Sequence, residues 1–151
     1  MKNIVYHGSL QGNIKKITAR KSTHQKLCIY ATPYETVALL FMGKGKGDLD
    51  TMIASNDDNL ELIERRPGVL KQIYDKEGYL YELDGSTFSH YDYLWSKEVI
   101  SFETSIEPLS ITHIPNILDA LEQKEKEGSL KIYRYPERPK NVPLDNSDLI
   151  D

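Results

Sequence analysis

The residues best suited to chemistry near the start of the chain are His7, Gly8 and Ser9, which follow the apolar run Ile4-Val5-Tyr6. A β-branched run predicts a strand over residues 4–9, and a glycine straight after the histidine lets the backbone turn and lie close to a ligand. An imidazole can exchange a proton near neutral pH, but a single histidine can equally end a strand and hydrogen-bond a neighbour. The choice depends on which other groups the fold brings to His7.

A second candidate is Tyr30, which lies near the end of the apolar run 27–32. This run predicts another short strand. Pro33 follows it and suits a strand exit and a helix entry, and residues 36–42 then predict a short apolar helix. Tyr30 is therefore expected at a strand end, as His7 is.

The third candidate is Glu98, which opens the β-branched part of a predicted strand over residues 95–102. Glutamate is depleted in strands, so an acid that leads such a run needs either solvent or a function. Glu103 and Glu107 are rival acids nearby. A carboxylate at a strand end could stabilise positive charge that develops on a substrate.

Positive charge gathers between the first two predicted strands. The basic residues there are Lys15, Lys16, Arg20, Lys21 and Lys26, with His24 among them. Residues 1–34 contain no acid, although the whole chain has a formal net charge of -4. The segment is either a solvated loop or a positive rim that receives phosphate oxygens. The net charge argues against a protein that coats nucleic acid through a broad basic face.

Beyond these segments the pattern predicts more strands than helices. The expected elements are a hairpin of strands 69–74 and 79–83, a strand over 106–111, a helix from 115 that stops at Gly128, and an edge strand within 129–135. Residues 49–66 have poor periodicity and predict only short irregular elements, and residues 43–48 predict a solvated connector. Because strands and helices do not alternate, the class is α+β with a twisted, mostly antiparallel, split sheet.

Length and composition bound the organisation of the chain. The 151 residues are enough for one domain, which we expect over residues 1–135, and residues 136–151 are rich in proline and acids and predict a disordered tail. No apolar run approaches a membrane span, and Met1 leads directly into a strand, so no signal peptide is expected. Cys28 is the only cysteine, which rules out an internal disulfide and a cysteine metal cluster and favours a cytoplasmic location.

Read in order, the three motifs around His7, Tyr30 and Glu98 are Tyr-His-Gly-Ser, Ile-Tyr-Ala-Thr-Pro and Lys-Glu-Val-Ile-Ser-Phe. Together they resemble the His-Tyr-Glu signature of ADP-ribosyltransferases of the diphtheria-toxin and poly(ADP-ribose) polymerase type. The resemblance spans most of the chain in outline, but only these short motifs carry it. It implies an ADP-ribosyltransferase-like split sheet with the three side chains lining one cleft.

The resemblance also implies that NAD is the substrate. It gives the Tyr30 ring a stacking role against nicotinamide, the Gly8 backbone a contact with the carboxamide, and His7 the ribose on the adenosine side. Phe41 would close the opposite face of the ring. Cleavage between nicotinamide and ribose builds oxocarbenium-like charge on the sugar, and Glu98 is the carboxylate expected to stabilise it.

The predicted NAD-binding set further includes Ser9 of the first motif and Arg20, whose guanidinium would meet a phosphate. Two departures from the family stand out. The family often places a serine in the helix after the tyrosine, where this chain has Thr36 and then Val-Ala, so either Thr36 substitutes or the contact is missing. Ser96 stands where a second acid or glutamine precedes the key glutamate in arginine-modifying members, which weakens the case for arginine as acceptor.

Three functional hypotheses remain open at this level. The first is a toxin-like mono-ADP-ribosyltransferase that transfers ADP-ribose to an unknown protein, nucleic-acid or small-molecule acceptor. The second is an NAD-dependent enzyme similar to the RNA 2'-phosphotransferases, which Arg20 and His24 allow and Glu98 disfavours. The third is a catalytically silent module that binds NAD or ADP-ribose, or an unrelated α+β interaction domain.

Overall fold

The computed structural model describes residues 3–21, 27–43, 51–56 and 59–144. The chain divides into two compact units, and each unit takes two separate stretches of sequence. The first unit comprises Met1–Met42 and Gly78–Ile114, and the second comprises Gly43–Glu77 and Pro115–Asp151. All three residues of the proposed signature, His7, Tyr30 and Glu98, belong to the first unit.

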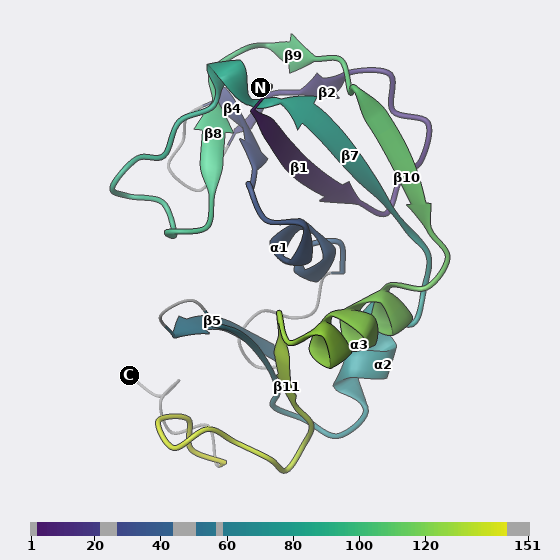
Figure 1. Cartoon of the computed structure of the whole chain (residues 1–151), viewed down its shortest axis with the longest axis vertical. Helices are drawn as coiled ribbons and strands as arrows, with labels where there is room; N and C mark the ends of the chain where they lie inside the picture. The colour runs from purple at the N-terminus through teal and green to yellow at the C-terminus, as the bar shows by residue number, and fades with distance from the viewer. Residues whose placement is uncertain (1–2, 22–26, 44–50, 57–58, 145–151) are drawn as a thin grey trace. The chain divides into compact units, whose positions relative to one another are not determined.

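The first unit is made mainly of antiparallel strands. Its elements are β1 (Ile4–Ser9), β2 (Ile17–Thr18), β3 (Arg20–Lys21), β4 (Leu27–Ala31), α1 (Glu35–Leu40), β7 (Gly78–Asp84), the short 3-10 helix η2 (Gly85–Thr87), β8 (Val99–Ser101), β9 (Ser105–Ile106) and β10 (Ser110–Ile114), as labelled in Figure 1. The strand orders are β1-β7-β10, β3-β4-β8 and β2-β9, and every pairing in them is antiparallel. A bridge between Tyr6 and Thr32 joins β1 to β4.

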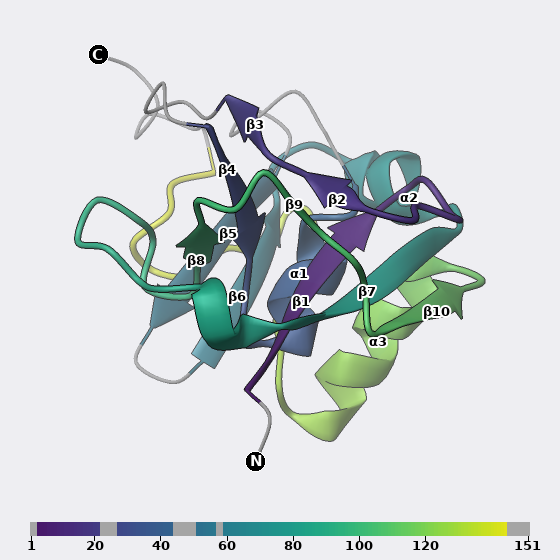
Figure 2. The same ribbon diagram turned by 90° about the horizontal axis from the view of Figure 1, so that it is seen from above.

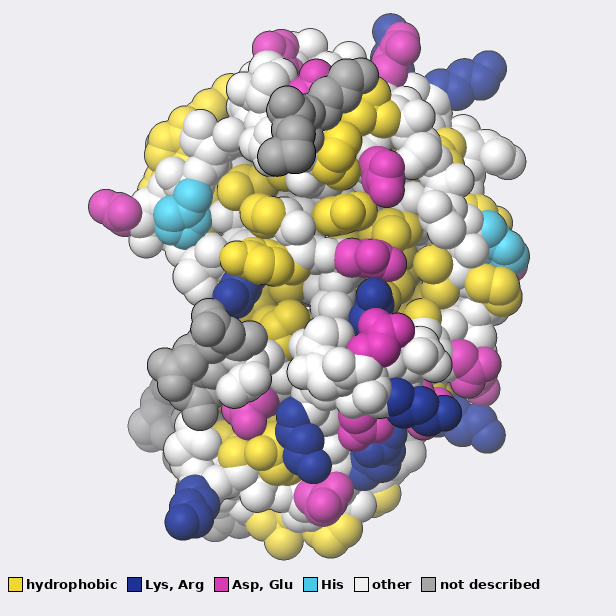
Figure 3. All heavy atoms as spheres, in the orientation of Figure 1, with side chains coloured by type: hydrophobic (Ala, Val, Ile, Leu, Met, Phe, Trp, Pro, Cys, Tyr) yellow, Lys and Arg dark blue, Asp and Glu magenta, His cyan; other side chains and the backbone are white. Residues whose placement is uncertain are grey.

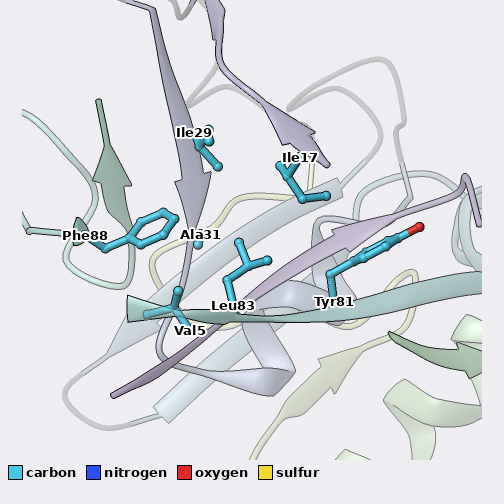
Figure 4. Packing of buried hydrophobic residues seen from close by; sticks show 7 residues of the cluster. All are labelled: Val5, Ile17, Ile29, Ala31, Tyr81, Leu83 and Phe88. Atoms are coloured by element: carbon cyan, nitrogen blue, oxygen red, sulfur yellow. The ribbon is translucent and has the colours of Figure 1, made fainter. Parts of the chain in front are cut away.

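One face of these strands forms the core of the first unit. The buried cluster consists of Val5, Ile17, Ile29, Ala31, Tyr81, Leu83 and Phe88, which Figure 4 shows converging from several strands. The hydroxyl of Tyr81 points away from the other six side chains in that view; it donates to the carbonyl of Gln11 at 2.6 Å and accepts the Ile14 N–H at 3.3 Å. The buried tyrosine thereby fastens the segment after β1 to β7 without leaving its polar end unsatisfied.

The helix α1 lies against β1, as Figure 2 shows from above. Five of its six residues are buried, from Thr36 to Leu40. A Cβ at Gly8 would overlap the carbonyl of Ala38 and approach the Met42 side chain at 2.8 Å. Glycine at position 8 is therefore required for the close approach of the helix to the strand.

The second unit combines a small mixed sheet with two helices. Its elements are β5 (Thr51–Asn56), β6 (Asn59–Glu64), α2 (Val69–Tyr74), α3 (Ile117–Glu127) and β11 (Lys131–Tyr133). The strand order is β11-β6-β5, in which β5 pairs antiparallel and β11 parallel to β6. The amide oxygen of Asn116 accepts the Asp119 N–H at 2.9 Å to cap α3, and Gly128 ends that helix at φ 86°.

A buried carboxylate organises the second unit. Glu64 ends β6 and is only 7% exposed. Its Oε2 accepts the Leu70 N–H at 2.9 Å, and its Oε1 accepts the Tyr135 N–H at 3.0 Å. Arg138 donates to the backbone carbonyls of Glu64 and Arg65. Glu64 therefore connects the start of α2 and the segment after β11 to one strand end, with charge-assisted bonds on both carboxylate oxygens.

The predicted α+β class is confirmed: the described residues form mostly antiparallel strands in several sheets, with three α-helices. The strand over 4–9 and the helix that stops at Gly128 are confirmed as well. The strand predicted over 69–74 is wrong, because these residues form α2. Its apolar positions recur at helical spacing, and the Glu64 carboxylate accepts a backbone N–H of the first turn.

Other expectations differ in extent. Residues 51–56 and 59–64, expected to be irregular, form paired strands, while the strand predicted over 95–102 is reduced to Val99–Ser101. The strand predicted over 106–111 is replaced by the two short strands β9 and β10.

The predicted domain over residues 1–135 and the predicted tail over 136–151 do not coincide with the two compact units. The single domain expected over 1–135 stays a prediction, and the two compact units divide these residues between them. Residues 136–144 of the predicted tail include Val142, which is 3% exposed. Residues 145–151 and 44–48 lie outside the described residues. No helix in the described part of the chain combines the length and hydrophobicity that a membrane crossing requires.

Replacing Glu64 by glutamine should lower the free energy of unfolding by about 1 to 3 kcal/mol, because an amide NH2 cannot accept the backbone N–H that one carboxylate oxygen now binds. Urea unfolding followed by circular dichroism measures the change. Glu61→Gln is the matched control: this partly exposed residue accepts one bond, from the Tyr133 hydroxyl at 3.2 Å. Equal losses for both variants would contradict the role given to Glu64.

Candidate functional site

The site begins where β1 and β4 meet. Tyr6 and Thr32 exchange two backbone hydrogen bonds, of 2.7 and 3.0 Å. Within the described residues this is the one bridge between the two strands. Because successive residues of a strand turn their carbonyl groups to opposite edges, the carbonyl of Tyr30, two residues before Thr32, faces the same edge as that of Thr32, toward β1. The ladder is thus interrupted beyond Thr32, and we call this place the β1–β4 break.

The side chain of His7 fills the β1–β4 break. Its Nδ1 lies 2.9 Å from the backbone oxygen of Tyr30. A carbonyl oxygen can only accept, so Nδ1 carries the proton and donates it. The half-buried imidazole also lies edge-on to the ring of Tyr81, with centroids 6.3 Å apart. Two contacts therefore fix the orientation of the ring.

The environment of His7 favours its neutral form. Burial is the main cause that lowers its pKa below the usual 6.5; the hydrogen bond to the Tyr30 carbonyl acts in the opposite direction, and the positive charge of Arg20 lowers it further. A neutral imidazole with the proton on Nδ1 keeps a lone pair on Nε2. At neutral pH the Nε2 atom of His7 can therefore accept a hydrogen bond from a hydroxyl group that reaches it.

Arg20 is the residue of the basic segment whose charge contributes to lowering the pKa of His7. It lies on β3, where it pairs with Cys28 of β4 and is exposed to solvent. Its charge is close enough to act on the pKa of His7. Lys15, Lys16 and Lys21 are exposed in the same segment, whereas His24 and Lys26 lie outside the described residues. Arg20 and His7 thus place a fixed positive charge beside a hydrogen-bond acceptor.

The ring of Tyr30 takes the other side of β4. It is partly buried against a small cluster of Cys28, Leu94 and Ile100. Ile29 and Ala31, the alternate residues, belong to the main core. His7 therefore meets the backbone of Tyr30, while the Tyr30 ring lies across the strand from that main core. The structure brings His7 to the Tyr30 carbonyl, whereas by strand alternation the two side chains leave their strands on opposite faces, and one cleft lined by both rings stays a prediction.

Glu98 lies immediately before β8. Its N–H donates to the carbonyl of Trp95 at 2.9 Å and closes a turn, and the next residue, Val99, pairs with Ala31. Because Val99 pairs with Ala31, the last residue of β4, Glu98 lies beside the end of that strand. Glu98 is partly buried. Glu98 leads the β-branched run, as the sequence predicts, but from a turn, because the strand predicted over 95–102 begins only at Val99.

Residues 8 and 9 also have structural roles. Gly8 permits the contact with α1, so its glycine does not by itself indicate a ligand. The Oγ of Ser9 accepts the N–H of Gln11 at 3.0 Å and shapes the exit from β1. Thr36, the other predicted polar contact, is 7% exposed within α1. None of these observations assigns a ligand contact to the three residues.

Aromatic side chains surround the turn that carries Glu98. The ring of Phe41, at the end of α1, packs edge-on against Trp95 with centroids 5.9 Å apart, and is 41% exposed. The Lys97 Nζ lies 4.6 Å from the centroid of the Tyr34 ring. Sequence reasoning assigned no role to Trp95, Lys97 or Tyr34. Their neighbourhood depends on how the turn folds back on α1, which no short motif encodes.

The surface charge agrees with the modest net charge of the chain. On the face drawn in Figure 3, acidic and basic side chains are interspersed, and neither forms one large patch. In the second unit, Arg134 forms ion pairs with Glu122 and Glu125. A mixed surface of this kind gives little support for coating nucleic acid.

In comparisons with known proteins, no protein-family model, curated protein or solved structure matches this chain.

Replacing His7 by asparagine should remove a pH dependence of stability. Because the folded state lowers the pKa of His7, its contribution is complete above pH 6.5 and is lost as the pH falls below 6.5 through the folded pKa. Asparagine keeps a side-chain N–H for the Tyr30 carbonyl but does not titrate. Urea unfolding between pH 7.5 and 5 should show wild-type stability falling relative to His7→Asn; a difference that is flat or grows toward acid would contradict the assignment.

Proposed function

We propose that this chain is a mono-ADP-ribosyltransferase that binds NAD, cleaves the bond between nicotinamide and ribose, and transfers ADP-ribose to an acceptor. The observation that carries the proposal is the neutral His7, held by the Tyr30 carbonyl in the β1–β4 break with Arg20 nearby. Glu98 lies immediately before the neighbouring strand β8, whose first residue pairs with Ala31 of β4. This combination supports the resemblance in the motifs with a physical arrangement.

The adenosine half of NAD would lie on the His7 side of the break. The Nε2 lone pair of a neutral imidazole accepts a hydrogen bond from a ribose hydroxyl. The guanidinium of Arg20 offers charged donors to the diphosphate. Besides burial, which is the main cause, the charge of Arg20 lowers the pKa of His7.

The nicotinamide half would lie on the face of β1 and β4 that carries the Tyr30 ring, so the proposal requires NAD to pass from one face of these strands to the other at the β1–β4 break. Residues two apart in a strand share a face, so Gly8 lies on the face of Tyr6, and Tyr30 lies on the face of Thr32. Because Tyr6 and Thr32 are paired, the Gly8 Cα and the Tyr30 ring belong to the same side. A flat amide-bearing ring is held by an aromatic face and backbone polar groups. Tyr30 and Phe41 would supply the faces and the Gly8 backbone the amide contact.

Cleavage of the bond between nicotinamide and ribose is favoured by a negative charge close to the sugar. As the bond from the anomeric carbon to the nicotinamide nitrogen breaks, its electron pair leaves with nicotinamide, and the ribose becomes oxocarbenium-like. The Glu98 carboxylate would stabilise that cation and orient a ribose hydroxyl. The acceptor then bonds to the anomeric carbon and gives up its proton.

Glu98→Gln separates catalysis from binding. The amide keeps the size of the side chain, so the dissociation constant for NAD should change only a few-fold, while the loss of charge should reduce nicotinamide release about 100- to 1000-fold. Titration calorimetry measures binding, and chromatography of released nicotinamide measures turnover. Glu103→Gln and Glu107→Gln are matched controls and should stay close to wild type.

Each outcome of that experiment decides between functions. Equal rates in all three variants would remove Glu98 from the mechanism. A wild-type chain that binds NAD and releases no nicotinamide would favour the silent NAD-binding module, and a chain that does not bind NAD would contradict the proposal altogether.

Arg20→Ala should weaken NAD binding about tenfold, close to 1.4 kcal/mol, because the diphosphate loses a charge-assisted contact. Lys21→Ala is the matched control: Lys21 is the adjacent basic residue, is equally exposed, and points to the opposite side of β3. Calorimetric titration with NAD measures both. Equal losses for the two variants would indicate only a general effect of positive charge.

A further inference from the structure

The backbone of Glu98 is held from both directions. Its N–H donates to the Trp95 carbonyl at 2.9 Å, and its own carbonyl lies 3.0 Å from Nδ1 of His90. A carbonyl accepts only, so His90 donates from Nδ1. The two peptide planes that flank the Cα of Glu98 are therefore both fixed. Since the direction of the Cα–Cβ bond follows from these planes, the direction in which the Glu98 side chain leaves the backbone is fixed as well.

The side chain of His90 is itself well placed to do this. Its neighbour Ser89 exchanges two backbone hydrogen bonds with Ile100, of 2.9 and 3.0 Å. Residues 89–100 thus form a loop closed at its base, with His90 and Glu98 just inside the closure. Leu94, 8% exposed, anchors the loop on the cluster that contains Ile100. The His90 ring adds a cross-link where the backbone ladder stops.

We infer that His90 is a positioning residue that holds the peptide group after Glu98, and so fixes the Glu98 carboxylate for its reaction. This inference rests on the proposed function. His90 is exposed, and its hydrogen bond goes to the backbone carbonyl of Glu98 and not to the carboxylate. We therefore expect it to act on the reaction through Glu98. A catalytic group gains from such support because small errors in its placement cost much of its effect.

Replacements of His90 can be chosen that differ in where the side chain carries an N–H donor. The Nδ2 of asparagine stands as far along the side chain as Nδ1 of histidine, whereas the amide of glutamine is one carbon further out, nearer to the position of Nε2. His90→Asn should therefore keep the bond to the Glu98 carbonyl. His90→Gln and His90→Ala should lose it.

We expect nicotinamide release at saturating NAD to fall about fivefold in His90→Ala and His90→Gln, consistent with one partly exposed hydrogen bond. The KM for NAD should stay within about twofold, and His90→Asn should turn over close to the wild-type rate. In a Glu98→Gln background, His90→Ala should cause no further loss, because the two residues act through one group. Wild-type rates in His90→Ala, or equal losses in His90→Ala and His90→Asn, would overturn the inference.

A second readout separates this inference from the proposed function. Carbon relaxation measured by NMR should show the Glu98 side chain as ordered in the wild type and in His90→Asn, and as more mobile in His90→Ala and His90→Gln. Glu103 serves as the internal reference and should not change. Equal Glu98 mobility in all four proteins would overturn the positioning role even in an active enzyme, whereas the absence of nicotinamide release from the wild type would count against the proposed function alone. The His90→Asn and His90→Gln pair keeps the test decisive if His90→Ala does not fold.

Discussion

The bridge between Tyr6 and Thr32 is the constraint on which the rest of the candidate site depends. It brings β1 and β4 into contact at one level, and β7 and β8 then complete the outer edges of the two strands. Beyond it, the Tyr30 carbonyl faces β1 without a backbone partner there and needs a donor, because an unpaired buried carbonyl is costly. The ring of His7 supplies that donor. The same side chain therefore completes the hydrogen bonding of the fold and, in the proposed function, would offer its second nitrogen to a ribose hydroxyl.

This double role explains why the site is assembled from a side chain on one strand and a carbonyl on the next. If β1 and β4 continued as a regular ladder, the backbone of β1 would occupy the Tyr30 carbonyl, and the imidazole would have no fixed tautomer. The interruption removes that competition. It also leaves Arg20, which pairs with Cys28 further along β4, near the ring whose pKa it lowers.

Local signals in the sequence account for much of the fold and for part of the site. The β-branched start of the chain predicts β1, and Asn116 and Gly128 mark the ends of α3. The pattern of residues 69–74 is ambiguous, because Val69, Leu70, Ile73 and Tyr74 fit a buried helix as well as a strand. The Glu64 carboxylate, six residues before Leu70, favours the helix by accepting its N–H, a contact that periodicity does not reveal. Strand ends likewise predict that His7, Tyr30 and Glu98 are neighbours. They cannot predict that His7 meets a carbonyl and not the Tyr30 ring, since that depends on where the ladder stops. The role inferred for His90 also follows from a loop closure that only the folded chain displays.

The division of each unit between two stretches of sequence has a consequence for how the protein is made. Strand β1 finds its partner β7 only after residues 78–84 have left the ribosome, and β7 in turn receives β10 from residues 110–114. The sheet of the second unit is completed later still, because β6 pairs with β11 only after residues 131–133 have been synthesised. Both sheets therefore close late, through contacts between residues far apart in sequence, which slows folding and prolongs the exposure of unpaired strand edges. Neither unit corresponds to a continuous fragment that could be synthesised and folded by itself.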